Sequence, residues 1–194
     1  NQLSQLLQGG GKATEAELVA TAKKVVAQVE KVRQLKRKRP VSLAVCSKAQ
    51  IRAYVEKRIA EEVKPEELEG QEWALKALGL IPENYPLQEK LVALYEEQIA
   101  GYYDPFAQKF FIADWIPLIM QAPIMAHELT HALQDQHFNL GPYLTPIKDN
   151  SDATTARQSL VEGDAVLTMM AYTLSAAGSN ISPFSSINAI VISG

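Results

Sequence analysis

The most informative stretch of this chain is Ala126-His127-Glu128-Leu129-Thr130-His131-Ala132-Leu133-Gln134-Asp135-Gln136-His137-Phe138. Pro123, just before it, suits the first turn of a helix, where its missing N–H needs no partner. Apolar and small residues then continue without a helix breaker to Phe138, and Gly141-Pro142 ends the run. The stretch therefore predicts a helix on which His127 and His131, four positions apart, project from one face about one turn apart.

Two imidazoles at this separation suit a single metal ion. Their nitrogens can both lie ~2.0–2.1 Å from one Zn²⁺. Glu128 is rotated ~100° from His127 by the helical period, so it stays near the ion without being forced to coordinate it. A general base that takes a proton from activated water must lie there. In a chain with only three histidines, this pattern inside an apolar helix predicts zinc ligands at His127 and His131 and a catalytic Glu128.

A catalytic zinc site needs a third protein ligand, and His137 is one candidate. It stands ten positions after His127, the outer spacing of the metzincin motif, but Gln134 occupies the position of the glycine that turns the metzincin chain back. In a continuous helix His137 lies ~9 Å beyond His131 along the axis and points off the shared face. We therefore expect His137 to be an ordinary polar residue at a helix end.

Glu162 is the other candidate, on a long helix expected over residues 153–177. It is the last glutamate of the chain and has apolar neighbours, where a carboxylate is costly unless it is paired or metal-bound. Gly163 lowers helix stability by ~1 kcal/mol relative to alanine, which we interpret as allowing two helices to approach closely. We predict Glu162 as the third ligand; the alternative is an ion pair with Arg157 or Arg33.

Two aspartates lie near these residues in the sequence. Asp164 points ~200° away from Glu162 on the same helix, so we expect it to support a ligand or to cap a neighbouring loop rather than to coordinate the ion. Asp135 follows His131 by four positions and could accept a hydrogen bond, although an exposed helix face is the simpler expectation.

The remaining segments predict an α+β fold that is mainly helical. Further helices are expected over 14–38, where Thr14 and Glu17 form a capping box, and over 47–61, 66–78 and 86–97. Strands are expected over 41–45 and on both sides of Asp104-Pro105, where residues 99–103 and 109–113 are rich in aromatic and β-branched side chains. These strands give a small antiparallel sheet packed on the helix with the two histidines.

Composition limits the class of protein. The 194 residues include 19 basic and 22 acidic ones, for a net charge of −3, so no overall basic field favours nucleic acid. The run Lys36–Arg39 is expected to complement the dipole at a helix C-terminus, with a nucleic-acid or membrane patch as the alternative. The single cysteine, Cys46, excludes an internal disulfide and a cysteine-based zinc site.

We expect one domain over residues 13–194, after a flexible leader over 1–12. It would comprise a helical N-terminal part (13–85), a catalytic part (86–178) and a tail (179–194) that looks truncated. Residues 165–194 carry no charge, but polar residues and a proline interrupt them after 177, so we expect a buried helix and a loop rather than a membrane span.

The sequence resembles the gluzincins, the thermolysin-like zinc metallopeptidases, and in particular their compact bacterial peptidase-MA-like branch. The matching motifs are Ala126–His137, Leu160-Val161-Glu162-Gly163-Asp164-Ala165 and the hairpin sequence Gly101-Tyr102-Tyr103-Asp104-Pro105. The resemblance implies His127, His131 and Glu162 as zinc ligands and Glu128 as the catalytic base. It fails at Val166, where thermolysin carries a supporting aspartate. Gluzincins also often use a Tyr or His to stabilise the oxyanion; Tyr103 and Tyr172 are the candidates, and a buried structural role is the simpler expectation for both.

The resemblance implies a peptidase with one Zn²⁺ ion, a peptide or protein substrate and export from a bacterial cell, and the charge balance predicts no nucleic-acid partner. The alternative is a latent or inactive zinc-binding domain whose tail, residues 179–194, lies in the cleft. The sequence leaves the substrate and the oligomeric state open.

Overall fold

A computed structural model describes residues 13–178 of the chain. Its contacts divide the chain into two compact units, one formed by the residues up to Val45 together with those from Ala100 onward, the other by Cys46–Ile99. The sequence placed an internal boundary between residues 85 and 86 instead. The expected leader and tail lie outside the described residues.

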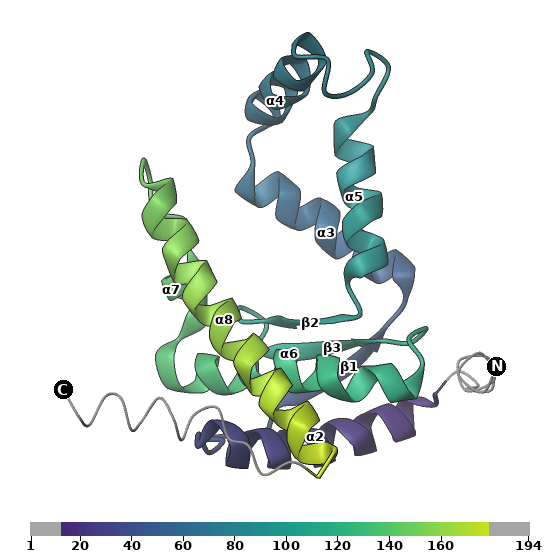
Figure 1. The fold of residues 1–194 in the computed structure, drawn as a ribbon, viewed down its shortest axis with the longest axis vertical. Coiled ribbons are helices and arrows are strands. Elements are labelled where there is room, and N and C mark those ends of the chain that lie inside the picture. The colour runs from purple at the N-terminus through teal and green to yellow at the C-terminus, as the bar shows by residue number, and fades with distance from the viewer. Residues whose placement is uncertain (1–12, 179–194) are drawn as a thin grey trace. The chain divides into compact units, whose positions relative to one another are not determined.

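Among the described residues, the first unit contains the helices α2, α6, α7 and α8 together with the small sheet (Figure 1). The fold class, α+β and mainly helical with a small sheet, is confirmed. The elements are α2 (Glu15–Arg33), β1 (Ser42–Cys46), β2 (Gly101–Asp104), β3 (Lys109–Ala113), α6 (Leu118–Phe138), α7 (Leu140–Leu144) and α8 (Ser151–Ala176).

The sheet has the strand order β1-β3-β2, so β2 lies at an edge. The predicted hairpin is confirmed: β2 and β3 are antiparallel, with Tyr103 opposite Phe110. The carboxylate of Asp104 accepts hydrogen bonds from two backbone N–H groups of the turn, each at 2.9 Å. Gly101 is required in β2 because a Cβ there would lie 2.9 Å from the carbonyl oxygen of Phe111.

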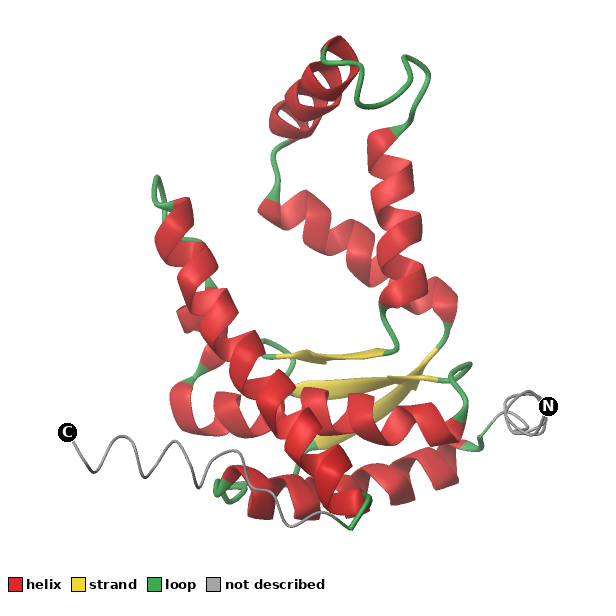
Figure 2. Cartoon of the chain, viewed as in Figure 1, coloured by secondary structure: helices red, strands yellow, loops and turns green. Residues whose placement is uncertain are grey.

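The core of this unit surrounds α6, which contacts the sheet, α2 and α8 (Figure 2). Its apolar side chains interleave with those of α2 and β3, and most of them are fully buried. The largest core side chains are Leu18, Val25, Val29, Phe110, Ile112, Met125, Leu129 and Leu133. This packing fixes α6, the helix that carries both histidines of the motif.

Two helix ends differ from the sequence expectations. Helix α2 ends at Arg33 rather than near Lys38, because Gln34 adopts a left-handed conformation (φ 60°) as the C-cap. Helix α6 begins at Leu118, so Pro123 lies inside it at the cost of one backbone hydrogen bond. It ends at Phe138, with Asn139 left-handed (φ 55°). Gly141-Pro142 therefore belongs to the short helix α7 and does not end α6.

The basic run Lys36–Arg39 does not decorate a helix end, since α2 stops before it. Instead it lies along the end of α6. The backbone N–H groups of Lys38 and Arg39 donate to Gln136 Oε1 at 2.8 and 3.1 Å, and the Gln136 amide donates to Arg39 O at 3.1 Å. Arg37 pairs with Glu30 at 2.9 Å. The run is therefore a structural connection between α2 and the sheet.

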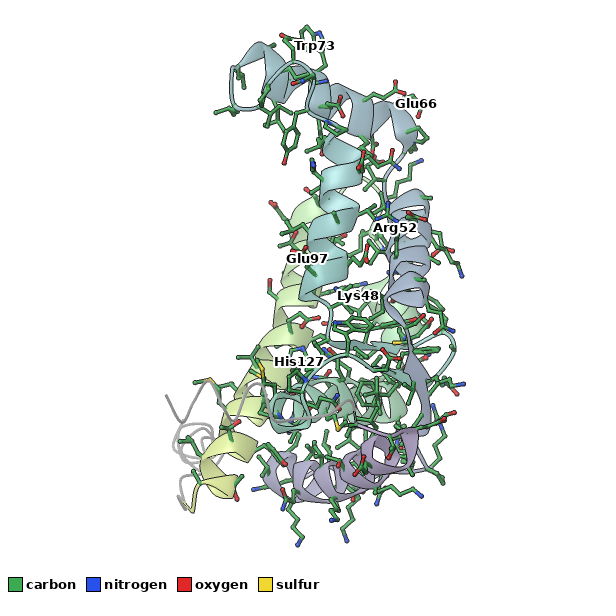
Figure 3. All side chains as sticks on the ribbon, turned by 90° about the vertical axis from the view of Figure 1, so that its right-hand side faces the viewer. Lys48, Arg52, Glu66, Trp73, Glu97 and His127 are labelled. Carbon is green, nitrogen blue, oxygen red and sulfur yellow. The ribbon has the colours of Figure 1, made fainter. Side chains whose placement is uncertain are left out.

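The second unit consists of α3 (Lys48–Glu62), α4 (Pro65–Ala77) and α5 (Leu87–Gln98). Helix α3 begins with a capping box between Ser47 and Gln50. Arg52, labelled in Figure 3, pairs with Glu56 at 2.9 Å and with Glu96 at 3.2 Å, which joins α3 to α5. Trp73 of α4 is 73% exposed. Across residues 13–178, no helix is long and apolar enough to cross a membrane.

Candidate metal centre

Helix α6 and helix α8 bring together the two histidines and Glu162. Nε2 of His127 lies 3.1 Å from Nε2 of His131 and 3.1 Å from Oε2 of Glu162, and Nε2 of His131 lies 3.5 Å from the same oxygen. Figure 3 labels His127 in the region where α6 contacts α8. These three residues form a cluster that could hold a metal ion.

The spacing of the three atoms fits a tetrahedral ion. In a tetrahedron with bonds of ~2.0–2.1 Å, the ligand atoms lie ~3.3–3.4 Å apart, about 1.63 times the bond length. The three observed separations, 3.1, 3.1 and 3.5 Å, bracket this value. One ion can therefore lie within bonding distance of all three residues, with a fourth position left for solvent or substrate.

The charges within the cluster also favour a cation. Hydrogen bonds from His127 and then His131 hold the pKa of Glu162 well below its usual range, although burial opposes this. Burial lowers the pKa of His131, but its hydrogen bond to Glu162 and the charges of Glu128 and Glu162 outweigh burial, so the pKa is raised. A metal ion that binds here must displace the proton from the protonated His131 ring, so the metal affinity depends on pH.

Glu128 lies beside the cluster and outside it. Its Oε2 accepts a hydrogen bond of 2.9 Å from the backbone N–H of Tyr103 in β2, which fixes one carboxylate oxygen. Burial raises the pKa of Glu128, against the opposing charges of His131 and His127 and the Tyr103 hydrogen bond. A carboxylate with a raised pKa next to a cation site has the properties of a general base.

Comparison with known proteins adds no family to this description. No protein-family model, curated protein or solved structure matches the chain. The gluzincin resemblance therefore rests on the sequence motifs alone, and the functional conclusion rests on the chemistry of these residues.

Gln134 supports His131 from the side that faces away from the cluster. Its Oε1 lies 2.8 Å from Nδ1 of His131. Its Nε2 donates to the carboxylate of Asp164 at 2.7 Å and to the carbonyl oxygen of Val161 at 3.1 Å. Asp164 in turn pairs with Nε of Arg33 at 2.7 Å. Asp164 thus supports a candidate ligand through Gln134, in line with the role expected for it.

Asp135 lies on the β2 side of α6, and the expectation that it occupies an exposed face is wrong. Its side chain is 1% exposed. It accepts hydrogen bonds from the Tyr103 hydroxyl at 2.8 Å and from the backbone N–H of Leu140 at 2.9 Å, and Arg39 lies 3.6 Å away. Burial was missed because the residues that enclose this carboxylate come from distant parts of the chain.

Neither tyrosine suggested for the oxyanion role is placed to fill it. The hydroxyl of Tyr103 donates to Asp135. Tyr172 packs in the hydrophobic core and lies ten residues after Glu162, ~15 Å further along α8. Both are buried structural tyrosines, as the simpler expectation held.

His137 lies outside the cluster, with its Nε2 2.8 Å from the carbonyl oxygen of Lys36. Arg33 pairs with Asp164, and Arg157 donates to the carbonyl oxygen of Tyr143 at 3.3 Å, so neither is seen paired with Glu162.

The interpretation of Gly163 is wrong: a Cβ there would meet no atom within 4 Å, so the residue is not needed for a close helix approach.

Proposed function

We propose that this chain is a zinc metallopeptidase in which His127, His131 and Glu162 hold one Zn²⁺ ion and Glu128 is the general base. The observation that carries this proposal is the convergence of two imidazole nitrogens and one carboxylate oxygen at 3.1–3.5 Å from one another, with the part-buried Glu128 carboxylate beside them. Two histidines, a glutamate and an open fourth position form a ligand set known from catalytic zinc sites.

The donor atoms favour zinc over the other common ions. Calcium and magnesium prefer sites made of oxygen ligands, and magnesium also requires octahedral geometry. Two neutral imidazoles with a single carboxylate and tetrahedral spacing suit Zn²⁺ instead. Competition by copper or nickel depends on supply in the cell rather than on the site, since their intrinsic affinities are comparable or higher.

A zinc ion bound there would polarise the scissile carbonyl and lower the pKa of the attacking water. Glu128 then acts through the carboxylate oxygen that the Tyr103 N–H leaves available. It accepts a proton from the water as the water attacks the carbonyl carbon, and delivers that proton to the amine nitrogen as the C–N bond breaks.

The sheet offers a way to bind an extended peptide. Strand β2 lies at the sheet edge, and its Tyr103 N–H contacts Glu128. A substrate that adds to this edge as a further strand would gain backbone hydrogen bonds and run next to the general base. This supports a peptide or protein substrate in an extended conformation.

The test is hydrolysis of a mixed peptide library by the zinc-loaded chain and by Glu128→Gln. The variant keeps the shape and the acceptor for the Tyr103 N–H, so it should bind zinc within a few-fold of the wild type. It should lose hydrolysis by ~10²–10⁴-fold, the usual contribution of general acid–base catalysis. Full activity of Glu128→Gln with zinc bound would contradict the mechanism. Stoichiometric zinc without wild-type hydrolysis would contradict the peptidase proposal and favour the latent, binding-only alternative.

A further inference from the structure

Among the hydrogen bonds of the described residues, Gln134 is the one buried side chain that links a candidate metal ligand to helix α8 through a ring nitrogen. The ligand is His131, and the nitrogen is Nδ1, which faces away from the cluster. It is 3% exposed and lies three residues after His131, so the two side chains are neighbours on the α6 surface. A buried amide in this position must have all its polar atoms satisfied, and its orientation then decides where the protons of its neighbours lie.

The orientation of the Gln134 amide follows from its partners on α8. The Val161 carbonyl and the Asp164 carboxylate can only accept hydrogen bonds, so the NH₂ group of Gln134 must face them. The amide oxygen is then left to face Nδ1 of His131 at 2.8 Å. Because that oxygen can only accept, Nδ1 of His131 must carry the hydrogen.

We propose that Gln134 is a positioning residue that holds His131 in the Nδ1–H tautomer, so that Nε2 presents its lone pair to the metal. The inference rests on the proposed metal site but not on peptide hydrolysis. Without Gln134, the ring can place its proton on Nε2 and can rotate away from Glu162. Both changes lower metal affinity, and partners of this kind typically contribute 10–100-fold to it.

Asp164 and Arg33 complete the support. Asp164 is turned away from the cluster, and its carboxylate receives both the Gln134 amide and Nε of Arg33 from α2. The ion pair holds the carboxylate in place, and the carboxylate keeps the amide from flipping. A chain of contacts thus connects α2, α8 and α6 to one ring nitrogen of His131.

The chain contains a matched control on the same helix. Gln136 is also a buried glutamine of α6, 8% exposed, with both ends of its amide hydrogen-bonded. Its partners are the backbone groups of Lys38 and Arg39, and the metal cluster is not among them. Methionine replaces either glutamine at nearly the same shape without the hydrogen bonds, so both variants should lose similar folding stability.

The experiment measures Zn²⁺ affinity by competition with a chromophoric chelator, at a temperature where circular dichroism shows each variant folded. Gln134→Met should bind zinc 10–100-fold more weakly than the wild type, and Gln136→Met should stay within threefold. Equal affinities for Gln134→Met and Gln136→Met would overturn the inference.

A second readout needs neither zinc nor substrate. Nitrogen–proton correlation spectra of histidine-labelled, metal-free chain at alkaline pH report which ring nitrogen carries the hydrogen. The wild type and Gln136→Met should show His131 with the hydrogen on Nδ1, and Gln134→Met should shift toward Nε2. An Nε2–H tautomer in the wild type would contradict the inference, whereas an inactive chain with the expected tautomer and affinities would contradict only the peptidase proposal.

Discussion

The two sides of α6 hold the candidate site in different ways. On the α8 side, Gln134 supports His131 and is itself held by the ion pair between Asp164 and Arg33. The side chains of this pair remain 19–26% exposed. On the β2 side, Glu128 and Asp135 both receive hydrogen bonds from Tyr103, one from its backbone and one from its hydroxyl. The first side contacts His131, a candidate metal ligand, whereas the second contacts Glu128, the proposed general base.

This difference separates metal binding from folding. Changes at Asp164 and Arg33 on the α8 side should alter metal affinity with modest effects on stability, because both side chains keep some contact with water. Changes on the β2 side should alter stability strongly and metal affinity little, because Asp135 is buried and does not contact the cluster. Three further measurements test whether the two sides are independent.

Asp135→Ala should lower the free energy of unfolding by about 3 kcal/mol. The change leaves the buried Tyr103 hydroxyl and the Leu140 N–H without their acceptor, and each such loss costs ~1–3 kcal/mol. Urea unfolding measures the change, with the exposed Asp152→Ala as the control expected to cost less than ~1 kcal/mol. A zinc affinity more than tenfold below the wild type in folded Asp135→Ala would break the separation of the two sides.

Removal of the metal should lower stability by about 2.7 kcal/mol when the free zinc concentration is 100 times the dissociation constant. The physical reason is that the proposed zinc ion would bind only the folded arrangement of His127, His131 and Glu162. Thermal unfolding with zinc and with excess chelator measures the difference. Asp135→Ala should show the same increment as the wild type, since the sides are independent; an unchanged wild-type transition would mean that no ion is held.

Tyr103→Phe should cost about 1–2 kcal/mol at neutral pH, and less at high pH. Burial, followed by the hydrogen bond to Asp135 and its charge, raises the pKa of Tyr103 above the value of 10.0 for a free tyrosine. The unfolded chain therefore loses this proton first, so the stabilisation is present below about pH 10 and is lost as pH rises beyond it. Urea unfolding at about pH 9 and about pH 11 should show the wild-type advantage shrinking by about 1.4 kcal/mol in total between the two pH values. A constant difference would contradict the burial of the phenol.

The sequence alone predicts most of the cluster, because local geometry decides it. His127 and His131 share a face in any regular helix, and Glu162 has apolar neighbours in the sequence, which pointed to it although its side chain is 48% exposed in the structure. The capping box at Thr14, the start of a helix at Ser47 and the hairpin around Asp104 follow from local signals in the same way. The convergence of Glu162 on the histidines was an inference from chemistry, and the structure places the three atoms together.

The roles of Gln134 and Asp135, which hold the residues of the site in place, could not be predicted because they depend on contacts between distant segments. Gln134 was noted only as a missing glycine, although its position three residues after His131 was a usable signal. Asp135 has no local sign of burial, since its partners Arg39 and Tyr103 are remote in the sequence. The early end of α2 depends on a left-handed Gln34, a conformation that glycine adopts more readily.

The most direct test of the account is the metal content of the wild type beside Glu162→Ala and His137→Ala, measured after dialysis against a small excess of Zn²⁺. The account predicts one zinc per chain in the wild type and in His137→Ala. It predicts a loss of affinity greater than 100-fold in Glu162→Ala, beyond what a supporting residue contributes. Stoichiometric, tightly held zinc in Glu162→Ala, or its loss in folded His137→Ala alone, would contradict the central claim that helix α8 supplies the third ligand.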